Sequence, residues 1–252
     1  MRIEVNNISY SYGKNRAIEN IKFEVDDGTM VSIVGPNGSG KSTLIKCLSG
    51  VLRIKEGSIL ISGEKLDKSI SRKQAQDIAY VPQDDFEPAM TTIFDFLMLG
   101  RRPYIQWHER DEDEDIVIGV IEKLKIGDLC MRYVGDLSGG QRQLVRIGRA
   151  LCQTPKVILL DEPTSNLDIG NRKEIMLLLE GLVEEGITVI TALHDVNLAF
   201  DYFDKVIMLK DGRLFREGGK ELAQNDVLSE LYGTNLNVRN IENQIIVLPN
   251  KY

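Results

Sequence analysis

One segment of this 252-residue chain constrains its fold more than any other: Gly35-Pro36-Asn37-Gly38-Ser39-Gly40-Lys41-Ser42-Thr43. It follows an apolar stretch, 30–34, that is typical of a buried strand, and it precedes 44–48, which begins an amphipathic helix. Glycines let the backbone fold closely around an anion, so that several N–H groups can point at it. The helix that follows adds its positive end. This order of strand, glycine-rich loop and helix predicts a phosphate-binding loop in an α/β fold.

Two side chains of the loop carry the chemistry that a nucleoside triphosphate requires. Lys41 can reach the β- and γ-phosphates, and the Ser42 hydroxyl can ligate Mg²⁺. The alternative is a flexible glycine turn with an incidental lysine, and the strand and helix on either side argue against it. We therefore predict a nucleotide site formed by Gly35, Pro36, Asn37, Gly38, Ser39, Gly40, Lys41, Ser42 and Thr43.

The composition is that of a protein with a full core and an acidic surface. Hydrophobic residues make up 42% of the chain and the formal net charge is −7, which disfavours a nucleic-acid partner. The three cysteines show neither metal-ligand nor disulfide spacing, and we expect Cys47 and Cys152 to lie in the core. We find no signal peptide at the start and no apolar run long enough to cross a bilayer. Any membrane role is therefore expected to be that of a peripheral, cytoplasmic subunit.

The pattern changes along the chain from β-rich to helical and back. Strands are expected at 3–10, 21–25, 58–61, 78–81, 157–160, 187–191, 206–209 and 212–215. Between about 84 and 153 the apolar positions recur at helical spacing, with one helix face marked by 116, 117, 120, 121 and 124. The acidic run 109–115 precedes that face, so we expect solvated carboxylates at a helix N-terminus.

A second polar site follows the strand at 157–160. Asp161 and Glu162 end this strand, so they are expected at the carboxyl edge of an open parallel sheet, beside the phosphate loop. Asp161 would hold Mg²⁺, directly or through water, and Glu162 would orient and polarise an attacking water. Two solvated acids at a strand end are the alternative, which the upstream phosphate loop makes weak.

A third motif lies between these two. Leu137-Ser138-Gly139-Gly140-Gln141-Arg142-Gln143 precedes a helix that starts near Leu144. This motif, in this position, resembles the signature motif of ABC transporter ATPases. The resemblance covers about residues 2–217. It implies an α/β P-loop NTPase with a RecA-like core, an N-terminal antiparallel β subdomain and an inserted α-helical subdomain at about 84–153. The ATPase domain would span 1–219, and 220–252 would be a short C-terminal extension rather than a regulatory domain.

Further residues match the family one at a time. Gln83 resembles the glutamine that joins the core to the helical subdomain and touches Mg²⁺, and His194 resembles the switch histidine that contacts the γ-phosphate from the end of a strand. Asp168 resembles an aspartate of the loop that crosses the dimer interface. Tyr12 resembles the aromatic residue that stacks on adenine, although Tyr10 lies close by and an aromatic residue in a strand is often part of the core. The catalytic residues implied are Glu162 and His194, and the Mg²⁺ ligands implied are Ser42, Gln83 and Asp161.

The resemblance also implies partners. In this family two ATP molecules lie between two ATPase subunits, and Ser138, Gly139, Gly140 and Gln141 of one subunit close over the nucleotide of the other. We expect a homodimer on the cytoplasmic side of the membrane with two transmembrane permease subunits and, indirectly, an extracytoplasmic binding protein. The Leu-Gly-Arg-x-Pro element at 99–103 and the run 193–199 are similar to ATPases that import iron siderophores, haem or cobalamin. A zinc or manganese importer and a soluble, non-transport ABC ATPase remain alternatives, and no residue identifies the solute.

Overall fold

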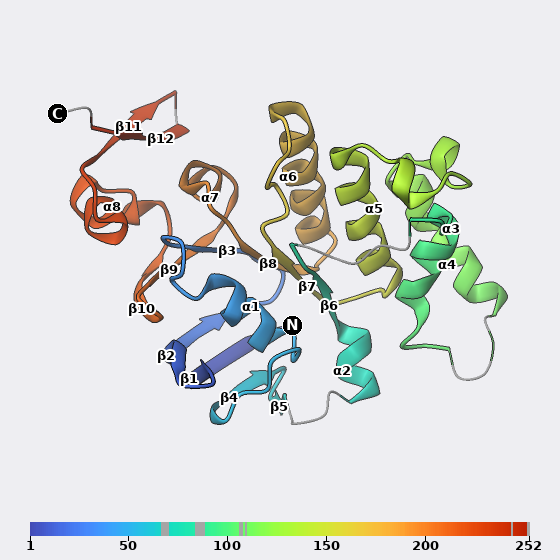
Figure 1. Cartoon of the computed structure of the whole chain (residues 1–252), viewed down its shortest axis with the longest axis horizontal. Coiled ribbons are helices and arrows are strands. Elements are labelled where there is room, and N and C mark those ends of the chain that lie inside the picture. Colours follow the sequence, from blue (N-terminus) through green and yellow to red (C-terminus); the bar gives the residue numbers. More distant parts are fainter. Residues whose placement is uncertain (67–70, 84–88, 106–107, 109, 243, 251–252) are drawn as a thin grey trace.

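The computed structural model describes residues 1–66, 71–83, 89–105, 108, 110–242 and 244–250. Figure 1 shows a central sheet flanked by helices, an N-terminal sheet beside it, and a group of helices at one end. The expected start of the helical subdomain, at about 84, and Glu109 of the acidic run lie outside the described residues. No helix in the described ranges is long and apolar enough to cross a membrane.

The central sheet contains six strands in the order β10-β9-β3-β8-β7-β6. They are β3 (Met30–Val34), β6 (Ile78–Val81), β7 (Val157–Asp161), β8 (Thr188–Ala192), β9 (Lys205–Lys210) and β10 (Arg213–Gly218). All neighbours are parallel except β9 and β10, which form an antiparallel hairpin. Every residue of β3, β7 and β8 is buried, as the continuous apolar runs predict. The strands nearest the phosphate loop therefore form the interior of the sheet.

Helices and a second sheet cover the two faces of the central sheet. One face packs against α1 (Lys41–Leu48) and the N-terminal sheet, in a core that contains Leu44 and Ile33. The opposite face packs against α6 (Ile169–Glu184) and α7 (Val196–Tyr202), in a core that contains Met176 and Val189. Because α6 connects β7 to the adjacent parallel strand β8, the three elements form a strand–helix–strand unit.

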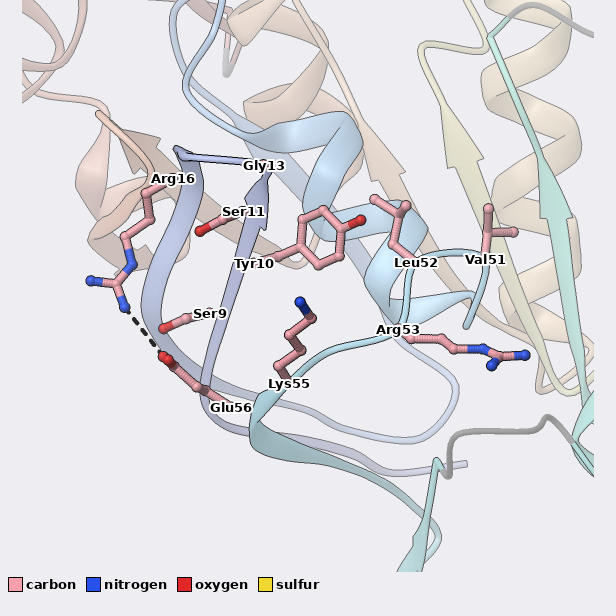
Figure 2. Close-up of a pocket in the computed structure, with 10 residues that line it drawn as sticks. All are labelled: Ser9, Tyr10, Ser11, Gly13, Arg16, Val51, Leu52, Arg53, Lys55 and Glu56. Atoms are coloured by element: carbon pink, nitrogen blue, oxygen red, sulfur yellow. Dashed lines mark hydrogen bonds and ion pairs between the residues drawn. The ribbon is translucent and has the colours of Figure 1, made fainter.

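The N-terminal sheet is antiparallel, as expected, with the strand order β2-β1-β4-β5. Its strands are β1 (Ile3–Tyr12), β2 (Asn15–Val25), β4 (Glu56–Ile61) and β5 (Glu64–Lys65). A cavity of about 460 Å³ lies between β1 and the loop that follows α1. In Figure 2 the Tyr10 ring points from β1 toward Leu52 and Lys55 of that loop. Tyr10 thus packs within the N-terminal sheet region.

The helical part of the chain contains three α-helices within the described residues. These are α3 (Ile93–Met98), α4 (Asp111–Lys123) and α5 (Gly139–Cys152), with 3₁₀ turns η1 (Leu99–Arg101), η2 (Gly127–Leu129) and η3 (Val134–Asp136). The short helix α2 (Arg72–Asp77) leads into β6. Val117, Val120 and Ile121 face the core of this region, which confirms the predicted helix face. Cys152 at the end of α5 and Cys47 in α1 are both buried, and burial raises the pKa of each thiol to about 12.

The expectation of solvated carboxylates at the start of α4 is wrong for Asp113. Its carboxylate is buried and pairs with buried Arg101, at 2.9 Å between Oδ1 and Nε. Arg101 also donates to the Cys152 carbonyl at 2.7 Å, and Asp113 caps the helix by accepting from the Arg110 N–H at 3.2 Å. The sequence pattern could not show that η1 brings an arginine over this one acid. The other acids of the first turn, such as Glu112 and Glu114, are exposed as expected.

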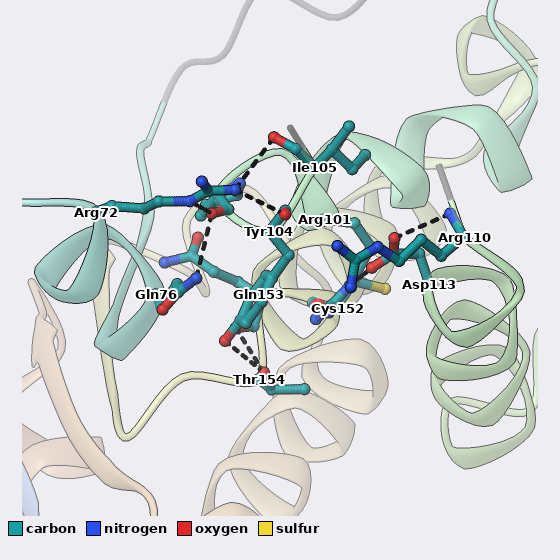
Figure 3. A network of polar contacts seen from close by, with 11 residues as sticks. Arg72, Gln76, Arg101, Tyr104, Ile105, Arg110, Asp113, Cys152, Gln153 and Thr154 are labelled. Carbon is teal, nitrogen blue, oxygen red and sulfur yellow. Dashed lines mark hydrogen bonds and ion pairs between the residues drawn. The ribbon is translucent and has the colours of Figure 1, made fainter. Parts of the chain in front are cut away.

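A network of polar contacts joins this pair to the central sheet (Figure 3). Arg72 of α2 donates from Nε to the Pro103 carbonyl and from Nη2 to the Tyr104 carbonyl, both at 2.7 Å. The Tyr104 hydroxyl donates to the Gln153 carbonyl at 3.0 Å, and the Gln153 amide donates to the Ile78 carbonyl at 2.6 Å. The end of α5 is therefore tied both to the segment after η1 and to the start of β6.

The C-terminal part adds a short helix and a hairpin. After η4 (Lys220–Leu222), α8 (Asn225–Tyr232) is followed by β11 (Leu236–Ile241) and β12 (Gln244–Pro249), which pair antiparallel. The hairpin packs on α7, where the Asn197 side chain accepts from the Val247 N–H at 2.7 Å. These elements thus rest on the helix that follows β8.

We predict that breaking the buried Arg101–Asp113 pair destabilises the fold mainly because the remaining charge would be buried without a partner. Replacing Arg101 by Ala should lower the free energy of unfolding by about 3–5 kcal/mol, since Asp113 would stay buried without its partner. The double variant Arg101→Met/Asp113→Leu should be closer to wild type. Urea unfolding measures both.

The matched control is Arg2→Ala, because Arg2 and Glu24 form an exposed pair whose loss should leave the free energy of unfolding almost unchanged. An Arg101→Ala protein as stable as this control would contradict the prediction.

Candidate functional site

The glycine-rich loop lies between β3 and α1, as the sequence predicts. Gly40 caps α1 with φ 101°. A Cβ atom on Gly40 would lie 2.8 Å from the Ala17 carbonyl oxygen, and one on Gly35 would lie 2.1 Å from the Leu209 carbonyl oxygen. Only glycine fits these two positions, since a side chain would meet backbone atoms. The loop therefore keeps its backbone close to its neighbours while its amides remain at the start of a helix.

Lys41 and Ser42 occupy the first turn of α1. The Lys41 ammonium group donates to the carbonyls of Gly35 at 2.9 Å and Pro36 at 3.2 Å. Burial lowers the pKa of Lys41, and the carboxylates of Glu162 and Asp161 oppose this effect. Lys41 is thus a desolvated cation held inside the loop, where it can act on a phosphate with little competition from water.

Asp161 meets this loop through Ser42. The Ser42 hydroxyl donates to Asp161 Oδ1 at 2.9 Å, although the two residues are far apart in the sequence. Burial raises the pKa of Asp161, while the Ser42 hydrogen bond and nearby Lys46 and Lys41 lower it. A hydroxyl and a carboxylate beside a phosphate loop are hard oxygen ligands of the kind that Mg²⁺ prefers. The residues present therefore fit a magnesium ion.

Glu162 holds a strained and buried position next to Asp161. Its φ is 55°, a left-handed value that is rare outside glycine, and its side chain is 8% exposed. Gln83 donates from Nε2 to one carboxylate oxygen at 2.8 Å, and His194 contacts the other oxygen through Nε2. Two segments distant in the sequence thus converge on this one carboxylate.

His194 lies slightly beyond the position expected for it. The strand β8 ends at Ala192, so His194 follows two residues later rather than at the strand end. The reason is that the Leu193 N–H bonds to the Ile33 carbonyl at 2.9 Å, which carries the backbone past β3 before it turns. This extra step places the half-exposed imidazole over Glu162.

A cavity of about 330 Å³ gathers these groups. It is lined by Ala17, Asn37, Gly38, Ser39, Gly40, Lys41, Ser42, Thr43, Gln83, Glu162 and His194. The sequence analysis missed Ala17, because a small apolar residue in a strand carries no signal of its own. Tyr12 does not line this cavity, but its ring is 49% exposed and meets the Tyr10 ring edge-on at 5.1 Å. Of the two tyrosines, Tyr12 has the more accessible ring.

The predicted signature motif lies elsewhere. Ser138 caps α5, because its hydroxyl accepts from the Gln141 N–H at 3.3 Å. In turn, the side-chain oxygen of Gln141 accepts from the Ser138 N–H. Among the described residues that line the cavity, none belongs to Ser138–Gln141, and Asp168 is also outside it. Asp168 instead caps α6, where it accepts from Asn171 at 2.8 Å. The structure thus brings the loop, both acids, Gln83 and His194 together and leaves the signature motif apart.

Two further contacts surround the site without a signal in the sequence. Arg146 of α5 donates to the Gln83 carbonyl at 3.1 Å, so the helix that begins with the signature motif also touches the Gln83 segment. Arg172 of α6 donates to Asp195, the neighbour of His194, at 3.1 Å. Both pairs depend on how separate elements pack, which residue spacing alone does not determine.

Comparison with known proteins agrees with this geometry. The ABC transporter family model matches residues 18–165. An ABC transporter ATP-binding protein of Methanocaldococcus jannaschii is 40% identical over 99% of this chain and 98% of its own length. The petrobactin import ATP-binding protein YclP of Bacillus subtilis is 35% identical over 97% and 98%.

A solved structure gives the same result for the fold. It is a chain of an inward-facing ABC transporter described as of the metal-chelate type. It superposes with a TM-score of 0.85 at 27% identity and covers 98% of this chain and 96% of the solved one. The chain therefore belongs to the ABC transporter family, as an ATP-binding subunit that hydrolyses ATP.

Proposed function

We propose that this chain is the ATPase subunit of an importer for an iron–siderophore, haem or cobalamin-type solute, and that it works as a dimer with a separate permease. The observation that carries the ATPase assignment is the cavity in which the glycine-rich loop, Gln83, Glu162 and His194 face one another. The Ser42–Asp161 hydrogen bond adds the second acid to the same site.

Each group in this site has a definite task in hydrolysis. The loop amides and Lys41 hold the phosphates and neutralise the charge that develops on the γ-phosphoryl group. Ser42, Asp161 and Gln83 would hold Mg²⁺, which supplies charge neutralisation at the phosphates when it is bound. Glu162 orients the attacking water and accepts its proton, and His194 contacts the γ-phosphate. Tyr12 stacks on the adenine through its exposed ring.

The separation of the signature motif from the cavity supports a dimer. Ser138 and its neighbours form a helix N-terminus suited to an anion, yet none of these residues lines the cavity of their own subunit. We propose that Ser138, Gly139, Gly140 and Gln141 close over the nucleotide of a second copy, with Asp168 in the interface between them. Each subunit then contributes half of two composite sites.

The cargo class rests on sequence similarity rather than on the site. The YclP relative is named for petrobactin import, and the solved metal-chelate transporter covers nearly the whole chain. The Leu-Gly-Arg-x-Pro element carries less weight, because Arg101 within it is occupied by the buried pair with Asp113. A permease in the membrane would receive the ATPase on its cytoplasmic side, with an extracytoplasmic binding protein delivering the solute.

The first prediction from this proposed function concerns nucleotide binding. Replacing Lys41 by Ala should raise the Kd for ATP about 10- to 100-fold, because hydrogen bonds to charged groups contribute roughly 1.5–3 kcal/mol. Titration with a fluorescent ATP analogue measures this change. The control is Lys22→Ala, an exposed lysine on β2, which should leave the Kd unchanged. Unchanged affinity in Lys41→Ala would rule out the proposed phosphate contact.

The second prediction concerns turnover. Glu162→Gln should retain ATP affinity and lower kcat about 100- to 1,000-fold, because an amide cannot accept the proton of the attacking water. The variant should also accumulate as an ATP-bound dimer in size-exclusion chromatography. Glu185→Gln, which alters an exposed acid, should hydrolyse ATP normally. Hydrolysis near the wild-type rate in Glu162→Gln would remove Glu162 from its proposed role.

The third prediction concerns cargo. A strain that lacks this gene should lose growth on ferric siderophores, haem or a corrinoid as the limiting source. The wild-type gene should restore growth and the Glu162→Gln gene should not. A defect confined to zinc or manganese limitation would assign the chain to the alternative importers. Normal growth on every source, with no permease co-purifying, would favour a non-transport ATPase.

A further inference from the structure

The segment that carries His194 is held mainly through its neighbours. Leu193 is 1% exposed, whereas the His194 side chain is 49% exposed. Within the described ranges, the contact with Glu162 is the single polar contact of the imidazole. A half-exposed ring with one polar partner can adopt more than one rotamer. The direction of the His194 ring therefore depends on how firmly the adjacent backbone is held.

Asp195 fixes that backbone from the other side. Its Oδ1 accepts from the Asn197 N–H at 3.0 Å and so caps α7. Its Oδ2 accepts from Arg172 Nη1 at 3.1 Å. Different elements therefore bind the two carboxylate oxygens of Asp195, the residue directly after His194. This residue is thus anchored to α6 as well as to α7.

Arg172 occupies an unusual place for a cation. It lies in the first turn of α6, one turn after the cap Asp168, where the helix end is positive and the turn itself holds no acidic residue. A cation there is disfavoured by the helix dipole. The Asp195 carboxylate offsets this effect. Because both side chains are about one-third exposed, the pair adds little to the stability of the fold. We therefore look for the effect of this pair in the position of the neighbouring side chains rather than in the stability of the fold.

The start of α6 is itself fixed by the signature helix. A Cβ atom on Gly140 would lie 2.5 Å from Asn171 Cγ, so the two helix starts are in close contact. Asn171 is held in turn by Asp168 through both its backbone and its side-chain amide. Arg172 therefore projects from a well-anchored turn.

We propose that Arg172 and Asp195 are positioning residues that set the direction of the His194 imidazole toward Glu162. The proposal rests on the catalytic role proposed above for His194. Neither residue touches the nucleotide cavity, so their effect on hydrolysis passes through His194. The competing explanation is that the pair only attaches α6 to α7.

The test uses variants that break the pair and preserve the rest. Asp195→Ser keeps a good cap for α7 but is too short to reach Arg172. Arg172→Gln removes the charge, and Arg172→Lys retains it. Arg2→Gln, in an exposed arginine–glutamate pair of the N-terminal sheet, is the control. Each protein is assayed for kcat, for ATP affinity, for melting temperature and for the NMR signals of labelled histidine rings.

The ring signals are a direct readout because the chain has two histidines, His108 and His194. Comparison with His194→Ala assigns them. In the nucleotide-free protein, Asp195→Ser and Arg172→Gln should shift the His194 signal and leave that of His108 in place. They should lower kcat about 10- to 100-fold at unchanged ATP affinity, since small displacements of a catalytic group are costly. Arg172→Lys should recover part of both effects.

Two results would overturn the proposal. One is an unmoved His194 signal in Asp195→Ser and Arg172→Gln, whatever their stability. The other is a loss of kcat that Arg172→Lys does not recover and that follows the melting temperature. If His194→Ala itself keeps normal turnover, the proposed role of His194 fails. In that case the NMR signal of His194 alone tests the positioning role. A shift of this signal in Asp195→Ser and Arg172→Gln would support that role.

Discussion

The candidate site depends on the parallel register of three central strands. Ile33 of β3 pairs with Ala192 of β8, and Ala192 pairs with Asp161 of β7. This single cross-strand row sets the glycine-rich loop, the segment of His194 and the two acids at one edge of the sheet. A shift of one residue in β7 would turn Asp161 to the opposite face and separate it from Ser42. The complete burial of these strands is what fixes that register.

The chain tolerates local costs at this edge. Glu162 adopts a left-handed backbone at a cost of roughly 1–3 kcal/mol, and Asp161 and Lys41 are both withdrawn from water. Contacts that bridge elements hold Glu162 there, because its N–H bonds to the Ala192 carbonyl and its carbonyl accepts from Ser165. Strain of this kind orients the carboxylate before any ligand arrives. It is consistent with a group whose task is to direct a water molecule rather than to stabilise the fold.

The elements and motifs of this chain could be predicted from sequence because each has a local cause. Glycine conformations, apolar periodicity and acids at a strand end indicated the loop, the buried strands and Asp161 with Glu162. The order of the strands could not be predicted in this way: β8 lies between β3 and β7, and no local pattern records that. The burial of Asp113 was missed for the same reason, since its partner Arg101 comes from another element. The contacts of Arg172 and Arg146 likewise arise only from packing.

These packing contacts connect the two separate parts of the proposed composite site. The helix α5 begins with the signature motif, and Gly140 at its start lies against Asn171 of α6. Two turns later, Arg146 of the same helix donates to the backbone carbonyl of Gln83. The side-chain amide of Gln83 in turn donates to Glu162. From α6, Arg172 reaches Asp195 beside His194, which contacts the other oxygen of Glu162. A rigid movement of α5 would therefore displace the contacts of both oxygens of the Glu162 carboxylate. In the proposed dimer, the helix that we propose closes over one nucleotide would in this way also adjust the acid that serves the other.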